Sequence, residues 1–359
     1  MSTIQKIILE QKKKLALNKV NDTLYNVNLK TNDSIFFGIE TFDRQNFSYN
    51  RNGTYEIKLI ENNSNLFHYK FDSLNFNQKR LPIEFYDQKQ FIENNSKIII
   101  LRDEKTNDFD FYRNSSRGVF KVNENETISL NIVLSDYNNN NTYLQIEIEP
   151  SNKNFIYDSI EDQFDKKIDK SLNYNITLNN LKLNFNKNTF YRDTSIDLNF
   201  EKDTLTVYNP NIILKNPYKV KFPYNNKGNF IGSLDKNNNV IYVSSNRKND
   251  YFEYKTKTLG KFFISTDTIG PIIKKINKKN RTNNKKIRLL IRDEETGIKK
   301  YTARINNEWA LFEYEPKKSL IQFKPDDFIQ LKEENKLFIV VEDLLGNKTI
   351  YNETIYYKP

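Results

Sequence analysis

Few residues in this chain have the chemistry that catalysis or soft-metal binding usually needs. The sequence contains a single histidine, His68, and no cysteine. One imidazole cannot form a histidine-rich zinc site, and a chain without thiols has no thiolate nucleophile, cysteine-ligated zinc or disulfide. His68 lies between aromatic residues in LFHYKF, a pattern typical of a β-strand. We therefore predict no catalytic residue, no metal ligand and no cofactor, and we do not expect this chain to be an enzyme.

Four aspartates follow strand-like segments, and each has an aliphatic residue four positions before it. They are Asp43, Asp136, Asp293 and Asp343. A turn containing asparagine or glycine follows each of them, so the carboxylate can accept backbone N–H groups while asparagine or glycine takes the left-handed position. Calcium is the alternative ligand for such carboxylates, with Glu294, Glu295 and Glu342 nearby, but no spaced calcium-loop motif is present. We favour turn capping and leave calcium binding open.

Other candidate residues give weaker signals. The acidic pairs Asp326-Asp327 and Glu333-Glu334 are interpreted as solvated surface groups, because neighbouring strand residues point in opposite directions. Trp309, in INNEWALFEY, is either a platform for stacking sugars or a core aromatic or hairpin clamp, and we favour the second interpretation. With nine glycines, the chain has no phosphate loop, dinucleotide fingerprint or nucleophile elbow.

The charge of the chain is strongly basic but dispersed. The formal net charge is +10 and the isoelectric point is about 9.2. Affinity for a polyanion is one interpretation, and lysine as solubilising filler on strand faces and edges is the favoured one. The only dense basic run, residues 274–288, is also rich in asparagine. We expect no specific binding to nucleic acid, because no nucleic-acid-binding motif is present.

The composition favours strands as the elements that position these residues. Aromatic residues make up 14% of the chain, with 22 Tyr and 26 Phe, and asparagine-rich turns separate the apolar segments. Tyr55, Ile57 and Leu59 alternate with polar residues, as in a half-buried strand. At 359 residues the chain is too long for one sandwich of about 100 residues. We predict an all-β protein of tandem immunoglobulin-like β-sandwich domains.

Four segments are expected along the chain. Residues 1–20 form either a short amphipathic helix or a hairpin, and residues 21–150 form an Ig-like sandwich with an irregular insertion and a helical turn within 76–91. Residues 151–268 form a second sandwich, and residues 269–359 form the C-terminal one, which begins at Gly270-Pro271. No run has the roughly 18 apolar residues of a membrane helix. The first residues lack the pattern of a secretory signal, because lysines at 12–14 interrupt the short apolar patch.

The order of several short motifs resembles the region that follows the catalytic domain in bacterial lysostaphin-type zinc metallopeptidases, the murein endopeptidases. FGIETFD at 37–43 and NRNGTYEI at 50–57 carry the first part of the resemblance, and FDSLNF at 71–76 and NIVLSDY at 131–137 the second. IRD at 291–293, INNEW at 305–309 and VEDLLGN at 341–347 resemble the terminal Ig-like module of that family. The resemblance covers nearly the whole chain.

The resemblance implies an accessory region and not a peptidase. Members of the family hold zinc with H-x-x-x-D and H-x-H motifs, and this sequence has neither. It therefore implies a non-catalytic region that positions a peptidase domain or binds envelope components such as peptidoglycan, in the cell envelope or outside the cell. A truncated or split reading frame would account for the missing catalytic part. The alternative is a stand-alone surface adhesin or glycan-binding Ig-like protein.

Overall fold

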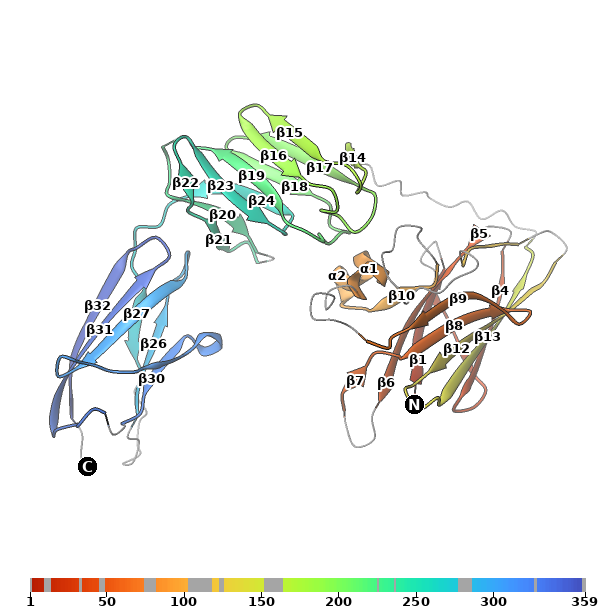
Figure 1. The fold of residues 1–359 in the computed structure, drawn as a ribbon, viewed down its shortest axis with the longest axis horizontal. Helices are drawn as coiled ribbons and strands as arrows, with labels where there is room; N and C mark the ends of the chain where they lie inside the picture. Colours follow the sequence, from red (N-terminus) through yellow and green to blue (C-terminus); the bar gives the residue numbers. More distant parts are fainter. Residues whose placement is uncertain are drawn as a thin grey trace. The chain divides into compact units, whose positions relative to one another are not determined.

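β-strands are the main elements of the computed structural model, which confirms the predicted all-β class of tandem sandwiches (Figure 1). The structure describes residues 2–9, 14–31, 34–44, 49–73, 82–102, 118–122, 126–151, 164–224, 226–235, 237–276, 286–325 and 328–356. The chain divides into two compact units, Met1–Gln163 with Pro210–Ile213, and Phe164–Asn209 with Leu214–Pro359.

The first unit is built on two sheets. One has the strand order β10-β6-β1-β2, with β7 also paired to β6. Its strands are β1 (Ser2–Leu9), β2 (Lys14–Leu15), β6 (Phe37–Arg44), β7 (Arg51–Asn52) and β10 (Ile98–Ile100). β1 pairs antiparallel with β2, so the first residues form a hairpin, and the helix that the sequence left open is not formed. A short pair, β5 (Ser34–Ile35) and β11 (Phe120–Lys121), lies outside both sheets.

The other sheet of the first unit has the order β3-β4-β13-β12-β8-β9. Its strands are β3 (Asn18–Lys19), β4 (Leu24–Lys30), β8 (Glu56–Glu61), β9 (Ser64–Lys70), β12 (Ile128–Ser135) and β13 (Asn141–Glu149). β4 runs parallel to β13, with Leu24 opposite Tyr143 and Lys30 opposite Glu149. Alternate residues of these strands, such as Ile57, Leu59, Leu130 and Ile132, face a shared apolar core.

Two short helices follow β9, in the region where the sequence predicted a helical turn. They are α1 (Pro82–Phe85) and α2 (Gln88–Asn94). Asp87 caps α2 by accepting the Gln90 N–H at 3.1 Å, and Asn95 ends the helix with a φ of 53°. Residues 76–81, which belong to the same prediction, lie outside the described part of the chain.

The second unit begins with a pair of sheets of orders β14-β17-β18-β24-β20-β21 and β15-β16-β19-β23-β22. Its strands are β14 (Lys166–Ile168), β15 (Tyr174–Leu178), β16 (Leu181–Phe185), β17 (Thr194–Glu201), β18 (Thr204–Tyr208), β19 (Tyr218–Pro223), β20 (Phe230–Leu234), β21 (Val240–Ser244), β22 (Arg247–Lys248), β23 (Tyr251–Thr256) and β24 (Gly260–Ser265). Large aromatic side chains fill this sandwich. Phe185 stacks on Tyr218, and Phe222 packs edge-on against Phe200.

The last two sheets have the orders β25-β26-β30-β29 and β28-β27-β31-β32. The strands are β25 (Ile272–Lys275), β26 (Ile287–Arg292), β27 (Ile298–Ile305), β28 (Glu308–Trp309), β29 (Glu313–Glu315), β30 (Leu320–Phe323), β31 (Glu334–Asp343) and β32 (Lys348–Tyr356). The first, second, sixth and fifth strands form one sheet, and the fourth, third, seventh and eighth form the other, which is the immunoglobulin-type arrangement. Leu289, Ile305, Phe323 and Ile339 are fully buried between them.

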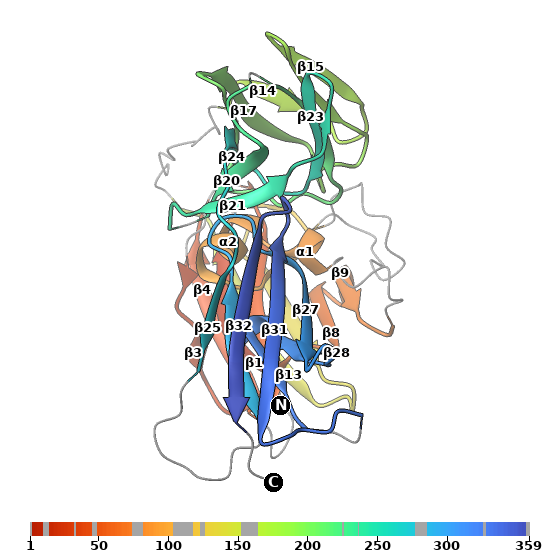
Figure 2. The ribbon, with the colours of Figure 1, turned by 90° about the vertical axis from the view of Figure 1, so that its left-hand side faces the viewer.

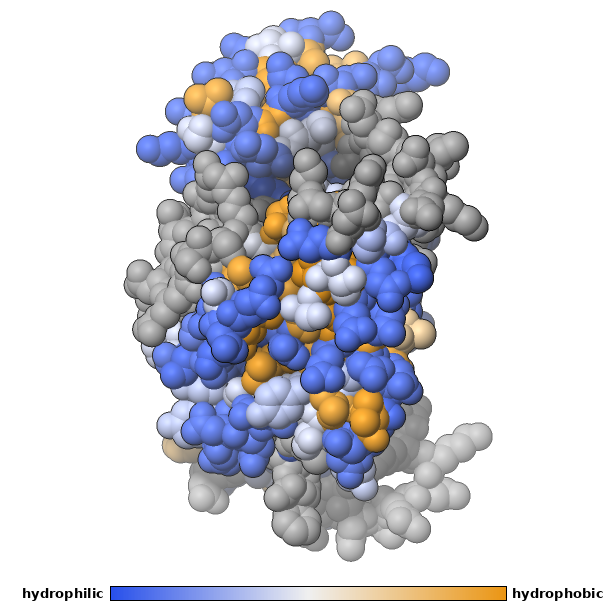
Figure 3. Space-filling view, turned by 90° about the vertical axis from the view of Figure 1, so that its right-hand side faces the viewer, coloured by the Kyte–Doolittle hydropathy of each residue, from blue (hydrophilic) through white to orange (hydrophobic). Residues whose placement is uncertain are grey.

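The boundaries predicted near 150 and 268 fall between these pairs of sheets. The second and third pairs nevertheless belong to one compact unit, so their division into separate domains stays a prediction. Figure 3 shows a mainly hydrophilic face with limited hydrophobic areas, as the mean hydropathy of −0.77 leads one to expect. Among the described residues, no helix has the length and apolarity that crossing a membrane requires.

Candidate functional site

Two of the predicted turn aspartates organise hairpins in the same way. Asp136, between β12 and β13, accepts the N–H groups of Asn138 and Asn140, both at 2.9 Å, on Oδ1. Asn140 Nδ2 donates to Asp136 Oδ2 at 2.7 Å, and Asn139 takes the left-handed conformation with a φ of 62°. Burial raises the pKa of Asp136, but the hydrogen bonds from Asn140 and Asn138 outweigh it and lower the pKa below the usual value.

Asp343, between β31 and β32, repeats this arrangement. Its Oδ1 accepts from the N–H groups of Leu345 and Asn347 at 2.8 and 2.9 Å, and its Oδ2 from Asn347 Nδ2 at 2.7 Å. Gly346 occupies the left-handed position with a φ of 95°. The turn-capping prediction is therefore confirmed for Asp136 and Asp343.

A third copy of this turn was missed in the sequence. Asp235, between β20 and β21, accepts from the N–H groups of Asn237 and Asn239 at 2.8 and 2.9 Å. Asn238 has a φ of 64°, and Asn239 Nδ2 donates to Asp235 Oδ2 at 3.1 Å. The signal was present, because aspartate with asparagine four positions later occurs at 136 and 140, 235 and 239, and 343 and 347.

Asp43 lies in β6, opposite Asn52 of β7. The turn predicted after it falls on residues 45 and 46, outside the described part of the chain, so its capping role stays a prediction.

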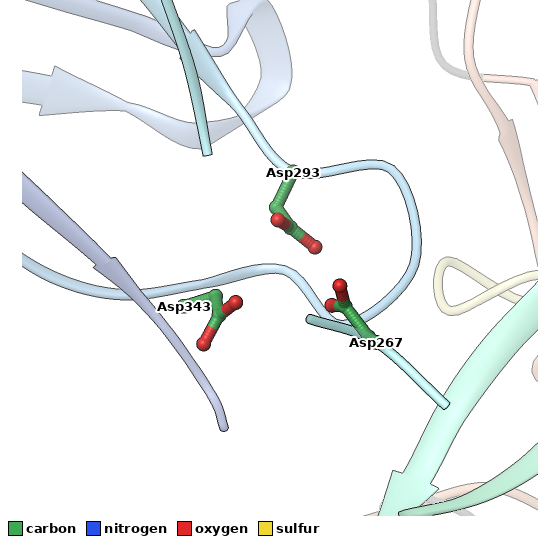
Figure 4. A group of neighbouring side chains, drawn as sticks. All are labelled: Asp267, Asp293 and Asp343. Atoms are coloured by element: carbon green, nitrogen blue, oxygen red, sulfur yellow. The ribbon is translucent and has the colours of Figure 1, made fainter. Parts of the chain in front are cut away.

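Three carboxylates converge in the second unit, from segments far apart in the sequence (Figure 4). They belong to Asp293 after β26, Asp343 at the end of β31, and Asp267 in the connection from β24 to β25. One oxygen of each lies within 4.8 Å of the others. Asp343 and Asp267 are buried, with 0% and 5% of their surface exposed, while Asp293 is half-buried.

Hydrogen bonds hold each member of this group, which we call the aspartate triad. Asp293 Oδ1 accepts from the N–H groups of Thr296 and Gly297 at 2.7 and 2.9 Å, which confirms its turn-capping role. Asp267 Oδ2 accepts the Thr296 hydroxyl at 2.8 Å. The backbone of Asp267 is held from both sides, because Asn229 of the preceding sandwich donates to its carbonyl at 2.7 Å and Asn347 does so at 3.3 Å.

The aspartate triad is the part of the described chain best suited to a metal ion. Carboxylate oxygens favour hard cations such as Ca²⁺, and their separations match neighbouring ligands of one ion. The sequence reasoning included Asp293 and Asp343 as calcium candidates but missed Asp267, which follows a strand with no repeated motif. The turn hydrogen bonds alone account for the position of each carboxylate, so a structural role is sufficient.

Glu295 adds a fourth carboxylate beside the aspartate triad. Burial, together with the charges of Asp267, Asp293 and Glu294, raises the pKa of Glu295 above the usual value. Its neighbour Glu294 pairs instead with Arg292, at 2.7 Å between Oε1 and Nη2.

His68 lies on β9, as predicted, and has an acidic partner. Its Nε2 donates to Glu56 Oε1 at 2.7 Å, and Lys58 Nζ lies 3.2 Å from Glu56 Oε2. Burial alone would raise the pKa of Glu56, but the hydrogen bonds from His68 and Lys58 lower it below the usual value. This arrangement is a partly buried polar cluster on two paired strands.

Trp309 lies on the surface, so the favoured interpretation of a core aromatic is wrong. Its side chain on β28 is 64% exposed. Trp309 pairs with Arg304 of β27, Arg304 with Phe338 of β31, and Phe338 with Asn352 of β32. These four residues form a row across the outer face of the sheet, since their strand neighbours Ala303, Ile305, Leu337 and Ile339 face the core. Figure 2 shows β32, β31 and β27 side by side.

A second row extends this surface. Thr302, Val340 and Ile350 pair across β27, β31 and β32 on the same side of the sheet. Ile350 is 59% and Phe338 37% exposed. We call the seven outward residues of the two rows the aromatic face: Thr302, Arg304, Trp309, Phe338, Val340, Ile350 and Asn352.

The next row of the sheet is ionic and bounds the aromatic face. Glu342 lies between Lys300 and Lys348 in the strand pairing, and Lys300 Nζ lies 3.3 Å from its Oε2. Lys299 Nζ is 3.3 Å from Glu342 Oε1. Burial raises the pKa of Glu342, but the hydrogen bonds with Lys300 and Lys299 outweigh it and lower the pKa.

Comparisons with known proteins identify no family. No protein-family model matches the sequence, and none of the curated proteins matches it. Solved structures with some similarity include fibronectin(III)-like modules of Clostridium thermocellum CbhA, with 7% identity, a TM-score of 0.17, and coverage of 100% of this chain and 94% of that one.

Two further solved structures are similar to the same degree. Drosophila N-cadherin EC1-3 has 10% identity and a TM-score of 0.19, over 94% of this chain and 99% of that one. The Bacteroides ovatus mixed-linkage glucan utilization locus protein SGBP-B, in complex with a mixed-linkage heptasaccharide, has 11% identity and a TM-score of 0.16, over 92% of this chain and 65% of that one. Such low TM-scores carry no argument about the site or the function of this chain.

Proposed function

We propose that this chain is a non-catalytic binding protein of the cell surface or extracellular space, which contacts carbohydrate through the aromatic face of its C-terminal sandwich. The observation that carries the proposal is the exposure of Trp309 in line with Phe338 on the outer face of one sheet. Single exposed apolar residues are common, but Trp309, Phe338 and Ile350 gather on the same outer face, and this grouping supports an interaction site.

The chemistry of the aromatic face suits sugar rings. A pyranose has an apolar face of C–H groups and an edge of hydroxyls, so it stacks on aromatic rings while polar neighbours bind its edge. Adjacent strands are about 5 Å apart, which places Trp309 and Phe338, two strands apart, at about 10 Å. An extended glycan can therefore contact both rings, and the side chains of Arg304, Asn352 and Thr302 offer hydrogen-bond partners for hydroxyls.

The association with an envelope peptidase that the sequence resemblance implies remains a prediction, since no comparison bears on it. Peptidoglycan consequently enters the proposal as one candidate glycan among several.

The test is a binding assay of the full chain with a panel of insoluble and soluble glycans that includes purified peptidoglycan. We expect Trp309→Ala and Phe338→Ala each to weaken binding to the recognised glycan by about tenfold or more, because central aromatic contacts dominate such interfaces. Tyr137→Ala is the matched control, since Tyr137 is 78% exposed on the first unit. Unchanged affinity of the Trp309 variant for every bound glycan would show that the proposal is wrong.

A further inference from the structure

The aromatic face contains a cation between its two rings. Arg304 pairs with Trp309 on one side and Phe338 on the other, so its side chain leaves the sheet between theirs. Arg304 is exposed, and no carboxylate in the described part of the chain forms an ion pair with it. By contrast, Arg292 in the same sandwich pairs with Glu294 at 2.7 Å.

From this geometry we infer that the aromatic face recognises an acidic glycan, whose carboxylate binds Arg304 while sugar rings stack on Trp309 and Phe338. The inference rests on the proposed function and specifies its ligand. A guanidinium presents a planar fork of N–H donors that fits both oxygens of a carboxylate. A uronic acid attaches this carboxylate to the sugar ring itself, so one residue of the glycan can satisfy both the charged and the stacking contact.

The charge around the aromatic face supports an anionic ligand. Outward positions on the same sheet carry Lys300, Lys336 and Lys348 in addition to Arg304, against the acids Glu334 and Glu342. Glu342 is neutralised by its lysine neighbours. The remaining charge on this side of the sheet is positive, so it attracts a polyanionic chain. It would attract an acidic protein surface as well, unless the shape of that surface does not fit the aromatic face.

The experiment compares one sugar backbone with and without its charge. Binding of polygalacturonate and of its fully methyl-esterified form to the full chain is measured by titration calorimetry, with alginate and hyaluronate as further carboxylated polymers. The variants are Arg304→Gln, Trp309→Ala and, as a control that removes the same charge from the second sandwich, Lys182→Gln, because Lys182 is exposed on β16. Circular dichroism verifies the fold of each variant.

We expect the protein to bind at least one carboxylated polymer more tightly than its ester. Arg304→Gln should weaken this binding about tenfold or more, since each tenfold corresponds to about 1.4 kcal/mol, and should weaken binding to the ester much less, because the ester has no carboxylate to pair with the guanidinium. Lys182→Gln should change neither. Trp309→Ala should weaken the binding of both the acidic polymer and its ester.

The outcomes separate the inference from the proposed function. Arg304→Gln could weaken binding of the acid and the ester equally, or weaken neither, while Trp309→Ala still weakens binding. The inferred acidic ligand would then be wrong, and the proposed binding of glycans by the aromatic face would remain supported. Binding of neutral glycans only would have the same meaning. If Trp309→Ala changes nothing, or if only a protein partner competes for the face, both are wrong.

Discussion

The carboxylates of the second unit show how burial and charge decide the state of single residues. Asp267, Asp293 and Asp343 share a small volume, and turn hydrogen bonds hold each of them. Glu295 has no such compensation, and its pKa is raised by burial and by the neighbouring charges. The Glu295 carboxylate therefore contributes unfavourably to folding when it is ionised.

We predict that Glu295→Gln stabilises the protein slightly at pH 7. A carboxylate whose pKa is raised in the folded state opposes folding above that pKa, and its penalty disappears as the pH falls below the unfolded value of about 4.5. The gain should be small, because Glu295 is exposed and solvent screens the repulsion. Urea midpoints at pH 7 and pH 4, measured in EDTA so that no divalent cation shields the carboxylates, check both the sign and the trend.

Glu294→Gln provides the control for this prediction. Removing the charge of Glu294 relieves only one of the three repulsions on Glu295 and also loses the pair with Arg292, so the gain should be smaller. A gain at pH 4 as large as that at pH 7 would contradict the electrostatic explanation.

At the scale of elements, one turn recurs in all three pairs of sheets. In each copy an aspartate accepts two backbone N–H groups, and the asparagine four positions later donates its side-chain N–H to the same carboxylate. The residue directly before that asparagine is left-handed. Asn139 and Asn238 take that conformation in two copies, and Gly346 in the third. Such a turn fixes strand register, and with it the face to which each side chain points.

We expect Gly346→Ala to destabilise the C-terminal sandwich by about 1–2 kcal/mol, since a residue with a Cβ is strained at a positive φ. Added bulk is not the reason, because no atom lies within 4 Å of the position of the new Cβ. Gly53→Ala is the control. It also meets open space but lacks the positive φ, so it should be neutral or slightly stabilising.

Urea denaturation of both variants measures the difference. A loss of stability in Gly53→Ala equal to that in Gly346→Ala would show that the left-handed conformation is not the cause.

Local sequence predicted the elements better than it predicted the candidate site. Alternation and turn residues identify strands and the turns at Asp136 and Asp343, because both depend on residues only a few positions apart. The aromatic face depends on the register between strands far apart in the chain. Trp309 was assigned to a core because aromatic residues more often fill sandwich cores. Alternation could not correct this assignment, since β28 has only two residues. Asp267 meets Asp293 and Asp343 only through tertiary packing.

At the scale of the whole molecule, the net charge of +10 has a measurable effect that is separate from specific binding. We predict that the full chain binds sugar-free polyanions such as polyphosphate or a sulfonate cation-exchange resin at low ionic strength, and that about 0.5 M NaCl releases it, because salt screens exposed charges over a few ångströms at such concentrations.

Salt titration on a sulfonate cation-exchange column checks this prediction, and Arg304→Gln should elute at nearly the same salt concentration as the wild type. Retention that depends strongly on Arg304 alone would mean that the basic character of the surface is localised and not dispersed.

The parallel pairing of β4 with β13 has a consequence for biosynthesis. β4 leaves the ribosome before β13, the neighbour that places it in the interior of its sheet and that is translated more than a hundred residues later. Nascent β4 must wait with one long edge unpaired, and slow closure of such distant contacts exposes chains to self-association. Completion of the N-terminal sandwich is thus coupled to the emergence of Glu149, and nascent chains released before that point are expected to be recruited by chaperones or to aggregate.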